Sequence, residues 1–105
     1  MASDVSADGL LKAYHDDLLL LEGKAVLSAD AYGQCAKDFL AYLAMKDVGL
    51  ASVTPLDLTY YLAYLRLEKQ EEDLTLAKVV SALRSFGSFL KREGIWQANV
   101  ALEID

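Results

Sequence analysis

The chain has 105 residues, of which 54% are hydrophobic and 25% are charged, and its formal net charge is −6. This composition excludes a disordered chain, and the length suits one compact domain with a single core. No apolar run approaches the length of a membrane span, and the N-terminus lacks the basic and apolar pattern of a secretory signal. We therefore expect one cytoplasmic domain that does not contact the membrane.

Two helices are expected in the first half of the chain. Apolar residues at three- and four-residue spacing predict the first over residues 6–21, with Gly23 after its end as a stop. The second is expected to begin at Ser28, a natural N-cap with Asp30 in the first turn, and to stop near Gly49.

The third helix has the clearest start in the sequence. Thr54 can cap it, Pro55 suits the first helical position, and the Asp57 carboxylate can reach back to the cap residue's N–H. The helix is expected to continue toward Glu68. A polar, acidic connection over residues 68–73 then separates it from the last helix.

The fourth helix, residues 74–92, carries four cations and no acid, whereas the rest of the chain holds six cations and all sixteen acids, a net of −10. Asp73 or Thr75 can cap it and Gly94 can end it. At 100° per residue, its apolar residues share one arc and its polar residues the opposite arc. The two arcs hold Leu76, Val79, Val80, Leu83, Phe86 and Leu90, and Lys78, Ser81, Arg84, Ser85, Ser88, Lys91 and Arg92.

That cationic, hydroxyl-rich face has two interpretations. It suits contact with phosphate, or it is a solvated helix surface with a favourable charge pattern at its C-terminal end.

The tail over residues 95–105 is too apolar to be free, and we expect a short terminal turn that packs back on the bundle. No stretch alternates with period two, so an all-α bundle of four to five helices is predicted.

Enzyme chemistry has little support in the residues. His15 is the only histidine and Cys35 the only cysteine, so a zinc site, a catalytic dyad and an internal disulfide are all unsupported. Glycine-rich phosphate loops are also absent from the sequence. We expect His15 at the surface or its boundary, Cys35 as a small buried apolar residue, and Tyr60, Tyr61 and Tyr64 mainly as core or boundary residues. The prediction is a non-enzymatic chain without cofactor or metal.

Several blocks follow one another in a characteristic order between residues 27 and 104. Leu27 and Ser28 open the second helix, and the block at residues 53–58 opens the third. The most specific blocks are the Ser-Ala-Leu-Arg-Ser-Phe run at residues 81–86 and the Phe-Leu-Lys-Arg-Glu-Gly run at residues 89–94. This order resembles the N-terminal core-binding domain, also called SAM-like, of tyrosine recombinases and phage integrases. Asn99 falls where that family usually turns its chain with Asn-Pro.

The resemblance implies a bundle that forms one half of a clamp around double-stranded DNA, during DNA integration or recombination, with its second and fourth helices in or near the major groove. The whole chain, residues 1–105, would be this one domain, and a separate C-terminal catalytic domain in the full-length protein would cleave and rejoin strands. The domain is expected to be monomeric in isolation and oligomeric on DNA as part of the full-length protein. The implied DNA-binding residues are Ser28, Gln34, Lys37, Thr75, Lys78, Ser81, Arg84, Lys91 and Arg92.

Three departures from the family pattern bear on affinity. Ala31, Cys35 and Ala36 stand where the family commonly has Thr, Tyr and Arg, Val100 replaces the usual proline, and acids at residues 71–73 adjoin the fourth helix. With fewer phosphate contacts, weak and salt-sensitive DNA binding is expected. The alternative function is a helical protein–protein interaction module whose acidic surface meets a basic partner.

Overall fold

The computed structural model describes residues 7–104, which form four α-helices and two 3₁₀ turns and contain no strand. The helices are α1 (Ala7–Leu20), α2 (Val26–Met45), α3 (Pro55–Leu67) and α4 (Asp73–Arg92), and the turns are η1 (Leu50–Ser52) and η2 (Val100–Glu103). This confirms the predicted all-α bundle. The predicted start of the first helix at residue 6 lies outside the described residues.

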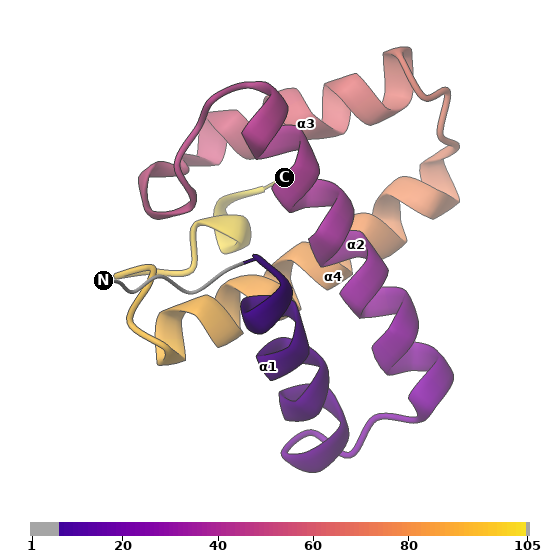
Figure 1. Ribbon diagram of the computed structural model, residues 1–105. Helices are drawn as coiled ribbons and strands as arrows, with labels where there is room; N and C mark the ends of the chain where they lie inside the picture. The colour runs from indigo at the N-terminus through magenta and orange to yellow at the C-terminus, as the bar shows by residue number, and fades with distance from the viewer. Residues whose placement is uncertain (1–6, 105) are drawn as a thin grey trace.

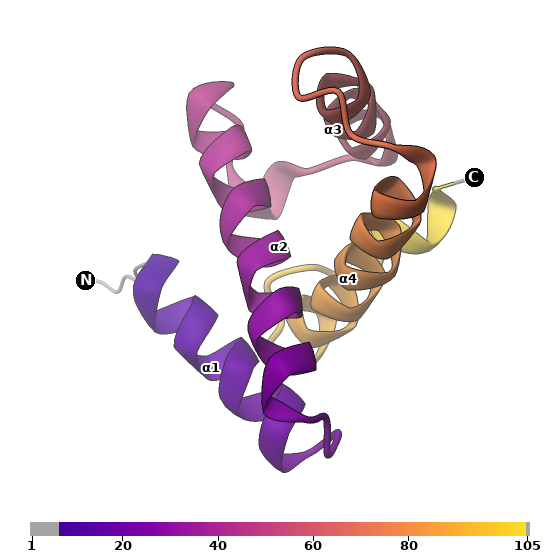
Figure 2. The same cartoon turned by 90° about the vertical axis from the view of Figure 1, so that its right-hand side faces the viewer.

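Two helical hairpins build the bundle (Figures 1 and 2). Helices α1 and α2 run antiparallel and side by side, and α4 crosses behind α2 and packs against it. Helix α3 leads into α4 through a short connection, and η2 packs against both α3 and α4. The C-terminal segment therefore closes the bundle, as the apolar tail predicts. No helix among the described residues is long and apolar enough to cross a membrane.

The core lies where all four helices meet. Its fully buried large side chains come from every helix: Tyr14, Leu18, Phe39, Leu58, Leu83, Phe86 and Leu90. On α4 the predicted apolar arc is buried except for Val80, which is half-buried, and Ala82, Gly87 and Phe89 extend it. In the tail, Trp96 and Ile104 are buried, and the Trp96 indole N–H donates to the Leu50 carbonyl at 2.8 Å.

The start of α3 confirms the predicted capping. Thr54 accepts a hydrogen bond from the Asp57 backbone N–H at 3.3 Å, and the Thr54 N–H donates to the Asp57 carboxylate at 2.9 Å, with Pro55 at the first helical position. Gly94 ends α4 with a φ of +78°, a conformation that glycine adopts without the steric penalty of a Cβ atom.

The predicted caps of the other two helices are wrong. Helix α2 begins at Val26 after Ala25, so Ser28 lies inside the first turn. A cap is worth only about 1 kcal/mol, and the tight turn through Gly23 and the burial of Ala29 outweigh it. Helix α4 begins at Asp73 with Glu72 as its cap residue, and no side chain caps it. The Asp73 carboxylate instead pairs with Arg66.

The end of α2 also differs from the prediction. The helix stops at Met45, four residues before Gly49, because Asp47 takes a left-handed conformation with φ of 57°. The Val48 N–H then donates to the Leu43 carbonyl at 2.9 Å, which closes the helix without a glycine.

Candidate nucleic-acid interface

Three of the nine predicted DNA-binding residues form one row on α4. Thr75, Lys78 and Ser81 are spaced by three residues, which places them along one side of the helix, and all three are exposed. Among the described residues Lys78 has neither a hydrogen-bond nor an ion-pair partner. The opposite arc of the same helix is buried, so the fold fixes the direction in which this α4 row faces.

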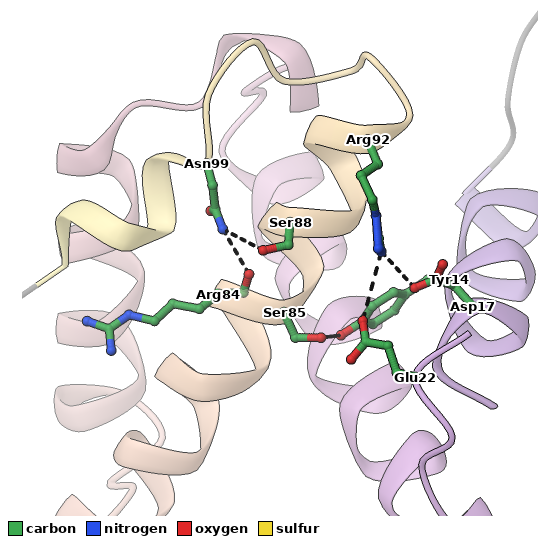
Figure 3. Close-up of polar contacts among 8 residues, drawn as sticks. All are labelled: Tyr14, Asp17, Glu22, Arg84, Ser85, Ser88, Arg92 and Asn99. Carbon is green, nitrogen blue, oxygen red and sulfur yellow. Dashed lines mark hydrogen bonds and ion pairs between the residues drawn. The ribbon is translucent and has the colours of Figure 1, made fainter. Parts of the chain in front are cut away.

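Arg84 lies further along α4 and is engaged within the protein. Its guanidinium donates to the Ile104 carbonyl at 2.8 Å and to the Ala101 carbonyl at 3.4 Å. Figure 3 shows the side chain extended toward η2. Arg84 therefore holds the C-terminal segment against α4. The sequence did not predict this role, because the partners of Arg84 lie 17 and 20 residues further along the chain.

The two cations in the last turn of α4 differ from each other. Arg92 pairs with Asp17 of α1 at 2.8 Å and approaches Glu22 at 3.9 Å (Figure 3). The Asp17 side chain is only 9% exposed, so this pair links α1 to α4 in a partly desolvated place. Lys91 is exposed and has no partner among the described residues.

On α2, Ser28 lies apart from Gln34 and Lys37. Lys37 follows Ser28 by nine residues, which places them on opposite sides of the helix at 100° per residue. Gln34 and Lys37 border a shallow hollow beside α1, together with Lys12 and His15. The Gln34 amide also donates to the Asp38 carboxylate at 2.8 Å. Gln34 and Lys37 therefore lie on the side of α2 that borders α1.

The three acidic residues at the start of α4, Glu71, Glu72 and Asp73, have different surroundings. Asp73 pairs with Arg66 at 2.7 Å. Glu71 is half-buried and borders a pocket between α2 and α3, whereas Glu72 is exposed. Asp73 is thus paired, whereas neither Glu71 nor Glu72 has an ion-pair partner among the described residues, and Glu72 is the more exposed of the two.

The remaining polar groups of interest serve the fold. His15 lies at the surface boundary, as predicted, and its Nε2 is 2.7 Å from the Asp30 carboxylate. Cys35 is half-buried, and burial, with a smaller contribution from Asp38, raises the pKa of its thiol. A raised pKa keeps the thiol protonated and unreactive. Within residues 7–104 no group of histidine, cysteine or acidic side chains could hold a metal ion.

Fold and surface together define a compact all-α domain with one polar row on a cationic helix. Residues 11–94 match the family model of the phage integrase N-terminal SAM-like domain. The chain therefore belongs to this family, and this sequence contains its N-terminal SAM-like domain.

A curated relative agrees with this assignment. The chain is 33% identical over 90 residues to the tyrosine recombinase XerD of Shewanella oneidensis, a match that covers 86% of this chain and 30% of XerD. The chain thus corresponds to about a third of the length of that relative. No solved structure matches the chain.

Proposed function

We propose that this domain binds double-stranded DNA as the recognition half of a site-specific tyrosine recombinase or integrase. Membership of the integrase family and the likeness to a tyrosine recombinase support the proposal. In the full-length protein a separate C-terminal domain would cleave and rejoin strands. We assign this role to the cytoplasm, with a monomeric isolated domain and an oligomeric full-length protein on DNA.

The observation that carries the proposal is the α4 row. Thr75, Lys78 and Ser81 offer one ammonium and two hydroxyl groups in a line, which suits contacts to successive phosphates or to a base edge. Lys78 is the cation of this row. Its ammonium group has no partner among the described residues, so it can contact a phosphate without breaking an ion pair.

The other predicted residues contribute in different ways. Ser28, Gln34, Lys37 and Lys91 are exposed, so each is available for a phosphate contact of its own outside the α4 row. Arg84 and Arg92 already donate to carbonyl or carboxylate oxygens. We propose that these two arginines mainly hold α4 in position rather than contact DNA.

A titration of labelled duplex DNA at about 50 mM salt tests the proposal. Lys78→Ala should weaken binding and reduce the slope of log K against log salt by about 1, because one phosphate contact is lost. Lys46→Ala is the matched control, since Lys46 is also exposed and outside any ion pair among the described residues, but it lies at the C-terminal end of α2.

Chemical-shift mapping during the same titration locates the contact. Changes should cluster on α4 around Lys78. No binding at millimolar protein, or equal losses in Lys78→Ala and Lys46→Ala, would refute the proposal. The alternative function is a protein–protein interaction module whose acidic surface meets a basic partner. If the domain has that function, the charge reversal Lys78→Glu should leave binding of the partner intact.

A further inference from the structure

A pocket with an unusual lining lies between α2 and α3, apart from the α4 row. Its volume is about 320 Å³, and Tyr42, Tyr61 and Tyr64 border it together with the carboxylates of Asp38 and Glu71. The rings form one cluster: the centroids of Tyr42 and Tyr61 are 4.8 Å apart, and those of Tyr42 and Tyr64 are 5.0 Å apart. Aromatic faces and carboxylates thus line the same small space.

Two of the phenol groups have unused hydrogen-bonding capacity. Tyr61 is 2% exposed and Tyr42 is 8% exposed, yet neither hydroxyl forms a hydrogen bond within the described residues. By contrast, the equally buried Tyr14 donates to the Ser85 hydroxyl at 2.7 Å. No buried side-chain nitrogen or oxygen among the described residues lacks a hydrogen-bond partner, so both of these hydroxyl groups reach solvent although their rings are buried. Both side chains border the pocket, so a ligand there could bond to hydroxyl groups that otherwise meet only water.

The electrostatics of the pocket favour a positive ligand. Burial raises the pKa of Tyr61 most, and the nearby Asp38 and Glu71 carboxylates raise it further, so the hydroxyl is neutral and the carboxylates supply the negative charge. The rings also attract cations within the protein. The Lys69 ammonium lies 6.0 Å from the Tyr64 ring centroid, and the Lys46 ammonium lies 5.9 Å from that of Tyr42.

We propose that this pocket binds an arginine side chain of a partner protein. A guanidinium group is planar, so it can stack on a tyrosine ring, and its five N–H donors can reach the two carboxylates and the phenol oxygens. Lys69 also lines the pocket and competes for the Tyr64 face. The proposal is independent of DNA binding, because it uses none of the α4 row.

The test uses three small probes and the whole 105-residue chain. N-acetyl-arginine methylamide is titrated at low salt while the tyrosine ring resonances are followed by NMR, and the citrulline analogue and spermidine are the comparators. We expect saturable shifts of Tyr42, Tyr61 and Tyr64 with the arginine probe. The uncharged citrulline analogue should give none, and spermidine, which cannot stack, should bind more weakly. Equal response to citrulline, or tighter binding of spermidine, would overturn the proposal.

Single-atom variants locate the site. Tyr61→Phe removes only the unpaired hydroxyl and should weaken the arginine probe by about fivefold while the fold is retained. Tyr14→Phe is the matched control, since it removes a buried hydroxyl outside the pocket and should leave probe affinity unchanged. Glu71→Gln should weaken binding, and Lys69→Ala should strengthen it. Unchanged affinity in both Tyr61→Phe and Glu71→Gln would contradict the assignment, whatever the DNA titration gives.

Discussion

At the scale of single residues, Asn99 connects the last turn of the fold to α4. Its amide nitrogen donates to the Arg84 carbonyl at 2.9 Å and to the Ser88 hydroxyl at 3.1 Å (Figure 3). Its amide oxygen accepts from the Ala101 N–H at 3.1 Å. The amide can lie so close to α4 because Gly87 has no side chain: a Cβ there would overlap the Asn99 amide oxygen and come within 2.7 Å of its Cγ atom.

Replacement of Gly87 by alanine should therefore destabilise the domain, against the usual preference for alanine in helices. We expect the free energy of unfolding to fall by about 1–3 kcal/mol, the range for overpacking a filled site. Gly33→Ala is the control, because the nearest atom to its added Cβ is 3.9 Å away, and it should stabilise by about 0.5–1 kcal/mol. Urea unfolding measures both, and a stabilising Gly87→Ala would show that Asn99 can move aside at little cost.

The buried tyrosines predict a loss of stability at alkaline pH. Burial raises the pKa of Tyr14, Tyr42 and Tyr61 above the usual value of 10.0. The folded state therefore keeps protons that the unfolded chain releases, so stability is complete below about pH 10 and falls above it. The shifts are largest for Tyr14 and Tyr61. Urea unfolding between about pH 9 and 11 should therefore show a slope of about −2.7 kcal/mol per pH unit or steeper, and the double variant Tyr14→Phe/Tyr61→Phe should reduce it.

At the scale of elements, α4 carries cations of two kinds. Arg84 and Arg92 bond to η2 and to α1, and thereby hold the helix against its neighbours. Lys78 and Lys91 are exposed without partners among the described residues. Positive charge on one helix is thus divided between building the fold and the proposed contact with DNA.

This division predicts opposite effects of substitution on stability and on DNA affinity. Arg84→Ala should lower the free energy of unfolding by about 1.5–3 kcal/mol, since it removes charge-assisted bonds to two carbonyl groups. Arg92→Ala should lower it by about 1 kcal/mol or more, because it leaves the shielded Asp17 carboxylate unpaired. Lys78→Ala should leave stability unchanged, within about 0.5 kcal/mol. A stable Arg84→Ala variant with lost DNA binding would instead assign Arg84 to the interface.

The elements also show which features the sequence could predict. The capping box of α3 was predictable because Thr54 and Asp57 are three residues apart, and the apolar arc of α4 because helical spacing alone defines it. The start of α2 was not, since packing of Ala29 and the turn at Gly23 outweighed the local preference of Ser28.

The candidate site was predictable only in part, for the same reason. The spacing of Thr75, Lys78 and Ser81 gave the α4 row directly. The partners of Arg84 and Arg92 lie 17 to 75 residues away in the chain, so only the tertiary structure shows them. The tyrosine pocket likewise joins Asp38 on α2 to Glu71 before α4, and no local pattern connects those two residues.

At the scale of the whole molecule, the net charge of −6 opposes an approach to DNA. Some of the acids are compensated locally, in pairs such as Asp17 with Arg92 and Asp16 with Lys12. Attraction therefore depends on a few local cations, and the slope of log K against log salt should be near −2, since each phosphate contact adds about −0.9. DNA binding through so few contacts would be weak. It would orient the domain on DNA only when another part of the full-length protein adds affinity.

Glu72 provides a direct test of how local this electrostatic balance is. It is exposed at the start of α4 without a side-chain hydrogen bond, three residues before Thr75, so Glu72→Gln removes repulsion beside the α4 row. Duplex DNA affinity at low salt should rise about two- to threefold, and the gain should vanish at about 1 M salt, where the Debye length is near 3 Å. Glu103→Gln on η2 changes the net charge equally and should alter affinity less. An equal gain in both variants would show that total charge, rather than the surface around Lys78, governs the approach of DNA.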